Sequence, residues 1–262
     1  MKRIHLFEFE DFSWFPSWLR KCMTRYIMVI HQLLESDQSL AKIISNILKH
    51  NKENRIIDLC SGSGGPMLSV HQKLTHEYNF KDLKLTLSDL YPDPETVKII
   101  TEGHKGEIEY KKESINAANV EGKGLRTMIC SMHHMPPKIA FDILKDAHDK
   151  KVPICIFEIS DNSFPIFLWW VSMIPAFLMT LLLTPRVKPL TWYQLFFTYI
   201  IPIIPLFIAW DGAVSNARTY TKEDLKELTT KLQSDDYNWD IKLIKAKGPG
   251  NMICLTGTPK SA

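Results

Sequence analysis

The chain has 262 residues, of which 45% are hydrophobic, and a formal net charge of +3. This length allows one domain with a sizeable core, and the small, scattered basic charge argues against a nucleic-acid-binding face. Five cysteines without a Cys-x-x-Cys spacing argue against a disulfide framework or a zinc cluster and predict reduced thiols in a cytoplasmic protein.

Along the chain, the predicted helices and strands alternate. Apolar residues at three- and four-residue steps predict one helix over residues 18–48, inside an N-terminal helical cap of residues 1–50. Short apolar runs predict strands at residues 55–59, 84–88, 107–111, 126–131, 153–158, 240–245 and 252–256. A helix is predicted over 138–149, and another begins at the Thr221 cap. This alternation predicts an α/β fold with a mostly parallel sheet whose last two strands pair antiparallel.

The most informative motif is the turn after the first predicted strand. The apolar run of this strand leads to Asp58, and the chain then passes Gly62 and Gly64 before a helical pattern resumes. Such a glycine turn lets backbone N–H groups approach a ligand closely. The second predicted strand ends at Asp89, where a carboxylate can accept hydrogen bonds from ribose hydroxyls. Together these features indicate a nucleoside-containing cofactor.

The glycine spacing distinguishes between two cofactors. A dinucleotide site needs a third glycine where this chain has Met67, although a nicotinamide-dependent oxidoreductase remains an alternative. The shorter Asp-Leu-x-x-Gly-x-Gly pattern resembles motif I of the class I S-adenosylmethionine-dependent methyltransferases, in which a glycine usually replaces Cys60. The resemblance implies a Rossmann-like, seven-stranded, mostly parallel sheet with helices on both faces and an antiparallel last strand. The core would comprise residues 51–163 and 211–262.

The resemblance also implies which residues surround S-adenosylmethionine. The turn after the first strand would hold its amino-acid part, Asp89 its ribose, and the residues after Asp89 and after the third strand its adenine. The implied set is Asp58, Cys60, Ser61, Gly62, Ser63, Gly64, Asp89, Leu90, Ser114, Ile115, Asn116 and Ser131. The alternative is that Asp58 only caps the following helix and Asp89 is a solvated turn residue.

Two histidines follow the fourth predicted strand. His133 or His134 is the first candidate for a general base that takes a proton from the methyl acceptor, and Glu158 is the second. The alternative is that one histidine packs in the core and the other lines the floor of the pocket. No carboxylate or third histidine stands nearby in the sequence to complete a ligand set, so no metal site is predicted.

A hydrophobic helical insert is predicted over residues 164–210, after the fifth strand. Two apolar runs, each long enough to cross a bilayer, flank a connection that contains Arg186 and Lys188. Their prolines and the basic connection favour a hairpin that dips into one leaflet or lies in the interface. The alternative is a soluble helical lid. With membrane association, the acceptor would be small or lipid-like and hydrophobic; a non-catalytic membrane-binding module that keeps the fold is a further alternative.

Two further segments are candidates for the pocket, one near the N-terminus and one directly after the insert. The aromatic segment of residues 7–18 either covers the pocket, joins the insert or simply caps the core. Residues 211–220 predict a polar turn, and with the insert they resemble a little-characterised bacterial group of methyltransferase-like proteins. Asp211, Arg218 and Tyr220 are therefore candidate substrate residues, unless Asp211 and Arg218 only form an ion pair.

Overall fold

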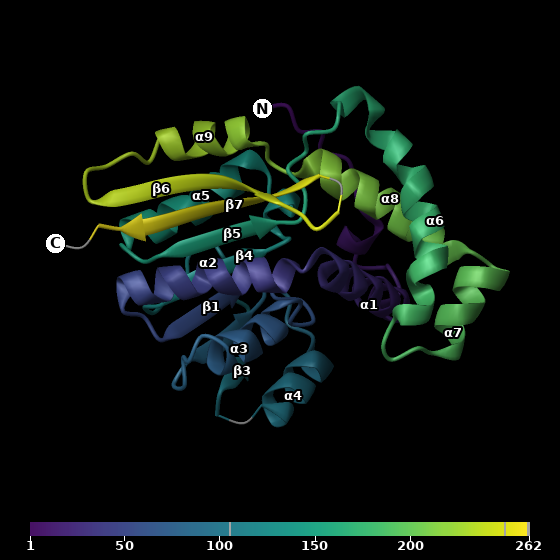
Figure 1. Cartoon of the computed structure of the whole chain (residues 1–262), viewed down its shortest axis with the longest axis horizontal. Coiled ribbons are helices and arrows are strands. Elements are labelled where there is room, and N and C mark those ends of the chain that lie inside the picture. Colours follow the sequence, from purple (N-terminus) through teal and green to yellow (C-terminus); the bar gives the residue numbers. More distant parts are fainter. Residues whose placement is uncertain (105, 249, 261–262) are drawn as a thin grey trace.

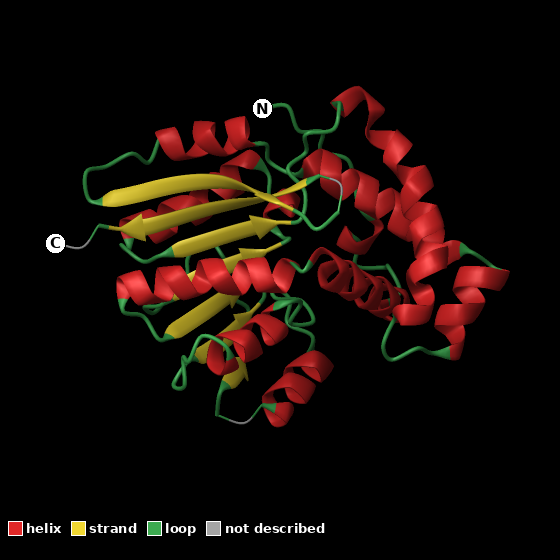
Figure 2. Cartoon of the chain, in the orientation of Figure 1, coloured by secondary structure: helices red, strands yellow, loops and turns green. Residues whose placement is uncertain are grey.

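One seven-stranded sheet forms the centre of the molecule in the computed structural model, which describes residues 1–104, 106–248 and 250–260 (Figures 1 and 2). The strands are β1 (Arg55–Leu59), β2 (Lys84–Ser88), β3 (Ile108–Tyr110), β4 (Leu125–Ile129), β5 (Ile154–Glu158), β6 (Tyr237–Lys245) and β7 (Asn251–Pro259). Their order is β3-β2-β1-β4-β5-β7-β6, and β7 alone runs against its neighbours. This is the class I methyltransferase fold, so the fold predicted from the sequence is confirmed.

Helices cover both faces of the sheet, as predicted. They are α2 (Ser36–Asn51), α3 (Met67–His76), α4 (Pro94–Gly103), α5 (Pro137–Asp149) and α9 (Lys222–Thr230). On one face, α2, α3 and α4 place residues such as Leu40 and Val70 against the sheet. On the other, α5 and α9 contribute residues such as Leu144 and Leu225. Two apolar cores therefore sandwich the sheet and fix the carboxyl ends of its parallel strands.

The helix predicted over residues 18–48 is two helices. The first, α1 (Ser17–Leu34), ends at Glu35, whose φ of 50° is left-handed, and α2 begins directly afterwards. Ser36 stabilises the break, because its hydroxyl bonds the carbonyl and the Nδ1 of His31. The sequence gives no sign of this break, because no glycine or proline stands there and the apolar spacing continues across it.

The insert and α1 build a separate helical layer beside the sheet, on the right of Figure 1. The elements of the insert are η3 (Ile166–Ser172), α6 (Met173–Leu183), η4 (Thr184–Arg186), α7 (Trp192–Leu195), η5 (Phe196–Ile200) and α8 (Ile203–Arg218). A third core joins α1 to this layer through residues such as Met23, Leu183 and Ile204. The aromatic segment of residues 7–18 packs here too, because Phe9 contacts Phe207 on α8.

The polar turn predicted over residues 211–220 is wrong for most of its length. Residues 211–218 continue α8, which ends only at Arg218. Gly212 does not interrupt the helix, and a Cβ added there would meet nothing within 4 Å. The polar residues that looked like turn formers instead face the N-terminal segment, and these tertiary contacts override the local preference.

Candidate functional site

The side chain of Asp58 fastens the turn after β1. Its carboxylate is 3% exposed and accepts hydrogen bonds from Thr127 Oγ1 at 2.6 Å and Ser61 Oγ at 2.7 Å. Ser88 Oγ donates to the Asp58 carbonyl at 2.8 Å, so β1, β2 and β4 are joined at one point. The alternative that Asp58 caps α3 is wrong, because α3 follows Pro66 and has no side-chain cap.

The turn itself needs left-handed backbone. Gly62 and Gly64 have φ values of 51° and 89°, which glycine adopts without steric cost. Cys60 also has a φ of 56°, although such a conformation costs a residue with a Cβ about 1–2 kcal/mol. Cys60 therefore keeps the backbone shape that a glycine would favour at this position, and the departure from the motif leaves the turn intact.

Asp89 lies against this turn. Its Oδ2 accepts the Gly62 N–H at 3.0 Å, and its Oδ1 accepts the Tyr91 N–H at 2.9 Å. Behind it, the Ile115 N–H donates to the Asp89 carbonyl at 2.9 Å, and Ser114 Oγ donates to the Leu90 carbonyl at 2.6 Å. Residues from after β1, β2 and β3 thus meet at one edge, as the strand order requires.

The remaining predicted cofactor residues lie around the same edge. Ser63 and Leu90 are exposed, and Asn116 accepts the Ala118 N–H at 2.9 Å. Ser131, after β4, is buried and donates to the Ile129 carbonyl at 2.9 Å. A cavity of about 540 Å³ opens farther along α4, lined by Pro92, Pro94, Val97, Lys98, Thr101, Glu102 and Lys112, and contains none of the predicted residues.

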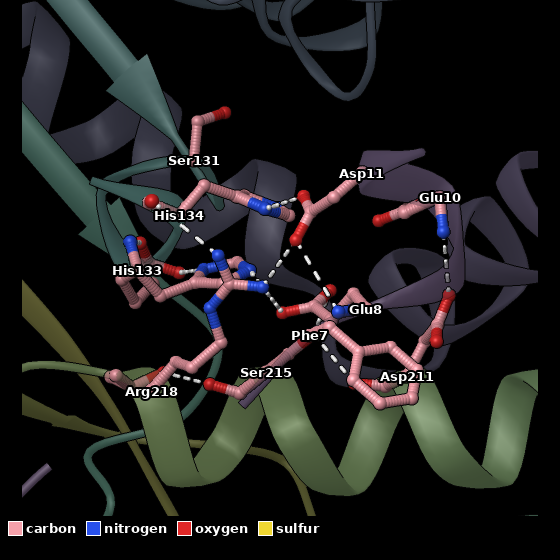
Figure 3. A network of polar contacts seen from close by, with 12 residues as sticks. Phe7, Glu8, Glu10, Asp11, Ser131, His133, His134, Asp211, Ser215 and Arg218 are labelled. Atoms are coloured by element: carbon pink, nitrogen blue, oxygen red, sulfur yellow. Dashed lines mark hydrogen bonds and ion pairs between the residues drawn. The ribbon is translucent and has the colours of Figure 1, made fainter. Parts of the chain in front are cut away.

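Each of the two histidines after β4 is held by a carboxylate, and Figure 3 shows the contact between His134 and Asp11. His133 Nδ1 lies 2.9 Å from Glu158 Oε2, and the His133 N–H donates to Glu158 Oε1 at 3.1 Å. His134 Nδ1 lies 2.9 Å from Asp11 Oδ1, and the two rings are 4.2 Å apart. The structure therefore brings together His133, His134 and Glu158, with Glu158 acting on His133 rather than standing apart.

Arg218 joins the histidine pair to the N-terminal segment. Its Nη1 contacts Glu8 Oε1 at 2.9 Å and Asp11 Oδ2 at 2.7 Å, and the side chain is 3% exposed. Burial raises the pKa of Glu8 to about 7. Burial also acts to raise the pKa of Asp11, but hydrogen bonds from His134 and Arg218 hold it below its usual value.

The side chains of Asp211 and Tyr220 are not hydrogen-bonded to Arg218 and have hydrogen-bond partners of their own. Asp211 accepts the backbone N–H groups of Phe9 at 2.8 Å and Glu10 at 3.3 Å, and burial raises its pKa to about 7. Tyr220 donates to the Met135 carbonyl at 2.7 Å. The expected alternative of an Asp211–Arg218 ion pair is wrong, because the two side chains bind different parts of the N-terminal segment.

Sequence reasoning missed two residues of this site, Glu8 and Asp11. They lie in an aromatic segment, more than 120 residues from the histidines, and no spacing in the sequence connects the two. The sequence hints at them in one way only. They stand among phenylalanines, which are expected to pack and to carry the neighbouring carboxylates into a partly buried position. Both acids therefore enter the site only through the fold.

We expect Asp58→Asn to flatten the pH dependence of stability. Burial raises the pKa of Asp58 to about 7, against 3.8 for an ordinary aspartate. Between these values the folded chain keeps a proton that the unfolded chain loses, so the free energy of unfolding falls as pH rises, by on the order of a few kcal/mol. The Tm of the variant should therefore drop less than that of the parent between pH 5 and pH 8.

The exposed Asp82 supplies the control for this measurement. Asp82→Asn should leave the drop in Tm unchanged. An Asp58→Asn variant whose Tm falls as steeply as that of the parent would show that Asp58 is already ionised at low pH.

The chain resembles three solved methyltransferase structures. Mitomycin 7-O-methyltransferase MmcR is 11% identical, over 84% of this chain and 53% of its own, with a TM-score of 0.49. The O-methyltransferase NcsB1 from neocarzinostatin biosynthesis, in complex with S-adenosylmethionine and 2-hydroxy-5-methyl naphthoic acid, is 12% identical over 85% and 57%, with a TM-score of 0.46. An O-methyltransferase family protein from Burkholderia thailandensis is 13% identical over 88% and 58%, with a TM-score of 0.48.

These likenesses concern the fold alone. The chain spans between 53% and 58% of the length of the three proteins. No family model matches the sequence, and no curated protein sequence matches it either.

Proposed function

We propose that this protein transfers a methyl group from S-adenosylmethionine to a small or lipid-like hydrophobic acceptor. The observation that carries the proposal is the 3.0 Å hydrogen bond from the Gly62 N–H to the Asp89 carboxylate. It places the glycine turn and the acid of the second strand at one edge, where a ligand of this fold binds. The turn would hold the amino-acid part, Asp89 the ribose, and Leu90 with residues 114–116 the adenine.

His133 is the residue we assign to proton removal. The cofactor supplies an electrophilic methyl group, and an acceptor hydroxyl or amine must lose a proton as it is methylated. Glu158 accepts from His133 Nδ1, which leaves Nε2 with the lone pair that takes this proton. Glu158 is then a positioning residue, and Asp11 has the same relation to His134.

The cofactor assignment is tested by titration calorimetry on the intact chain. S-adenosylhomocysteine should bind in a one-to-one complex, and NADH should not. NADH binding without S-adenosylhomocysteine binding would instead favour a nicotinamide-dependent oxidoreductase. Incubation of a membrane extract with isotopically labelled methyl donor, followed by mass spectrometry, should then reveal a methylated product. Cofactor binding without any product would favour a non-catalytic module.

We also propose that the insert contacts a membrane. Phe167, Trp170, Ile174, Leu178 and Leu182 are all more than half exposed and follow one another at steps of three and four residues. They form one apolar stripe along η3 and α6, because such steps keep side chains on one helix face. An unpaired apolar surface of this extent is costly in water and is typical of lipid or protein contact.

The shape of the insert favours a shallow hairpin. Residues Ile166–Arg186 are long and apolar enough to cross a bilayer, with a mean hydropathy of 2.1 over 18 residues of which 11% are buried. The second apolar run bends by 82° between Trp192–Ile200 and Ile203–Arg218. A bend of this size at the interface would leave the sheet beside the membrane and open a route for a lipid-like acceptor.

We expect the double variant Ile174→Lys/Leu178→Lys to lose binding to uncharged vesicles of phosphatidylcholine. Two apolar side chains contribute about 3–6 kcal/mol when they leave water, so the partition should weaken by at least about 100-fold in a flotation experiment. Ile99→Lys, which alters an equally exposed isoleucine on α4, should float like the parent. Equal flotation of the double variant and the parent would count against membrane contact through this stripe.

A further inference from the structure

We propose that Glu8, His133 and His134 form a binding site for a divalent transition-metal ion such as Zn²⁺. One ligand atom of each residue lies within 4.8 Å of the other two. Glu8 is fully buried and His133 is 6% exposed, so the group is held inside the fold. Two imidazoles and one carboxylate are a ligand set that suits zinc or iron, and three protein ligands leave a position open for a further ligand.

The orientation of the two rings is the second observation that points to a metal. Glu158 takes the Nδ1 of His133 and Asp11 takes the Nδ1 of His134, both at 2.9 Å. A proton on each Nδ1 leaves each Nε2 with its lone pair, and within residues 1–104, 106–248 and 250–260 neither Nε2 has a hydrogen bond. Carboxylates hold metal-binding histidines in this way, because they fix the tautomer and the ring orientation.

Glu8 completes the set from a distant part of the sequence. Its Oε1 lies 3.9 Å from His133 Nε2, which is too long for a hydrogen bond. Two ligands of one zinc ion, each about 2.0–2.2 Å from the metal, stand roughly 3.3–3.6 Å apart, so the two atoms need to approach by only a few tenths of an ångström. Ser215 Oγ donates to Glu8 Oε2 at 2.8 Å and limits the rotation of the carboxylate.

Arg218 supplies the competing explanation. Its guanidinium binds both Glu8 and Asp11, so it could be the cation that these acids require, with no metal involved. The guanidinium accounts for the two acids, but among the described residues it leaves both Nε2 atoms without a hydrogen bond, whereas a metal ion would use them together with Glu8. Figure 3 shows Arg218 in contact with Glu8 and Asp11, and in a metal complex it would orient these two acids without being a ligand itself.

The location of the cluster suggests what the ion would do. His133 and His134 lie in η2 (Met132–His134), directly after β4, and Ser131 Oγ donates to the Cys60 carbonyl at 3.4 Å. The cluster therefore adjoins the turn that we assign to the methyl donor. If the proposed function holds, an ion there would bind the acceptor oxygen and lower the pKa of its hydroxyl, so that solvent water takes the proton instead of His133. Metal binding itself does not depend on the proposed function.

Zinc titration of chelator-treated, intact protein tests the proposal. Calorimetry should give one Zn²⁺ per chain, and Co²⁺ should give visible absorption bands of a bound ion. His134→Ala and Glu8→Gln should each weaken zinc binding at least 10-fold. His76→Ala, which removes an exposed histidine on α3, should bind zinc like the parent and reports non-specific binding.

Three outcomes overturn the proposal: no stoichiometric zinc binding, binding that survives unchanged in both variants, or equal loss in His76→Ala. Each would mean that the cluster is an ion-pair network only. Circular dichroism melting confirms that the variants are folded, and His134, at the rim of the cluster, offers the milder change. A separate S-adenosylhomocysteine titration separates the two proposals. Cofactor binding without zinc binding overturns the metal site alone, whereas zinc binding without cofactor binding overturns the proposed function.

Discussion

Replacing Asp89 by alanine is expected to weaken S-adenosylhomocysteine binding by about 10- to 100-fold in titration calorimetry. Hydrogen bonds to a charged group contribute about 1.5–3 kcal/mol each, and 1.4 kcal/mol is tenfold in affinity. A ribose would offer the carboxylate two such bonds, but the Gly62 and Tyr91 N–H groups already occupy it in the free protein. The net loss is therefore smaller than the sum of two full bonds.

A conservative variant and a surface variant make this result specific. Asp89→Asn keeps one acceptor oxygen and should lose less affinity than Asp89→Ala. Asp82→Ala, at an exposed position before β2, should bind like the parent. If Asp89→Ala binds S-adenosylhomocysteine as tightly as the parent, the assignment of this edge to an adenosyl cofactor fails.

The second large effect is expected on stability. Arg218→Met should lower the free energy of unfolding by about 3–5 kcal/mol, because it leaves a buried carboxylate without its cation. Arg218 is 3% exposed, and Glu8, which it contacts at 2.9 Å, is fully buried. Because burial raises the pKa of Glu8 to about 7, the loss measured by urea unfolding should grow as the pH rises from 6 to 9.

Two further variants test the cause of that loss. Adding Glu8→Gln to Arg218→Met removes the stranded charge and should recover part of the stability. Lys21→Met breaks an exposed ion pair with Glu95 and should cost less than about 1 kcal/mol. A loss of similar size in Arg218→Met and Lys21→Met would mean that the network around Glu8 is solvated rather than buried.

The sheet was the most predictable part of this molecule. Strands β1 and β2 are short apolar runs, and a short apolar run between helical segments of an α/β chain is typical of a buried parallel strand. The helices were less predictable where tertiary contacts decide. Glu35 breaks a helix without a glycine, and Gly212 continues one despite its turn-forming neighbours. Along residues 211–218 the deciding contacts come from the distant N-terminal segment, whereas at Glu35 they come from the local bonds between Ser36 and His31.

The candidate site divides in the same way. The glycine turn and Asp89 could be found because a strand and its following turn carry them together in sequence. The sequence predicts a role for Arg218 but not its partners, because Glu8 is 210 residues away. A ligand set assembled from His133, His134 and Glu8 has no sequence spacing to reveal it. This ligand set can be recognised only in the folded structure, where the N-terminal segment lies next to the residues after β4.

The long link between Arg218 and the N-terminal segment also bears on how the protein is made. Glu8 and Asp11 leave the ribosome 210 and 207 residues before Arg218 does. At about 5–20 residues per second, they wait roughly 10–40 s for their counter-charge. Most of the sheet can form during that time, but β6 and β7 come later still. The acids and their aromatic neighbours therefore dock late, and chaperones that shield exposed aromatic segments during translation should matter more for this chain than for a protein whose first helix finds its partners nearby.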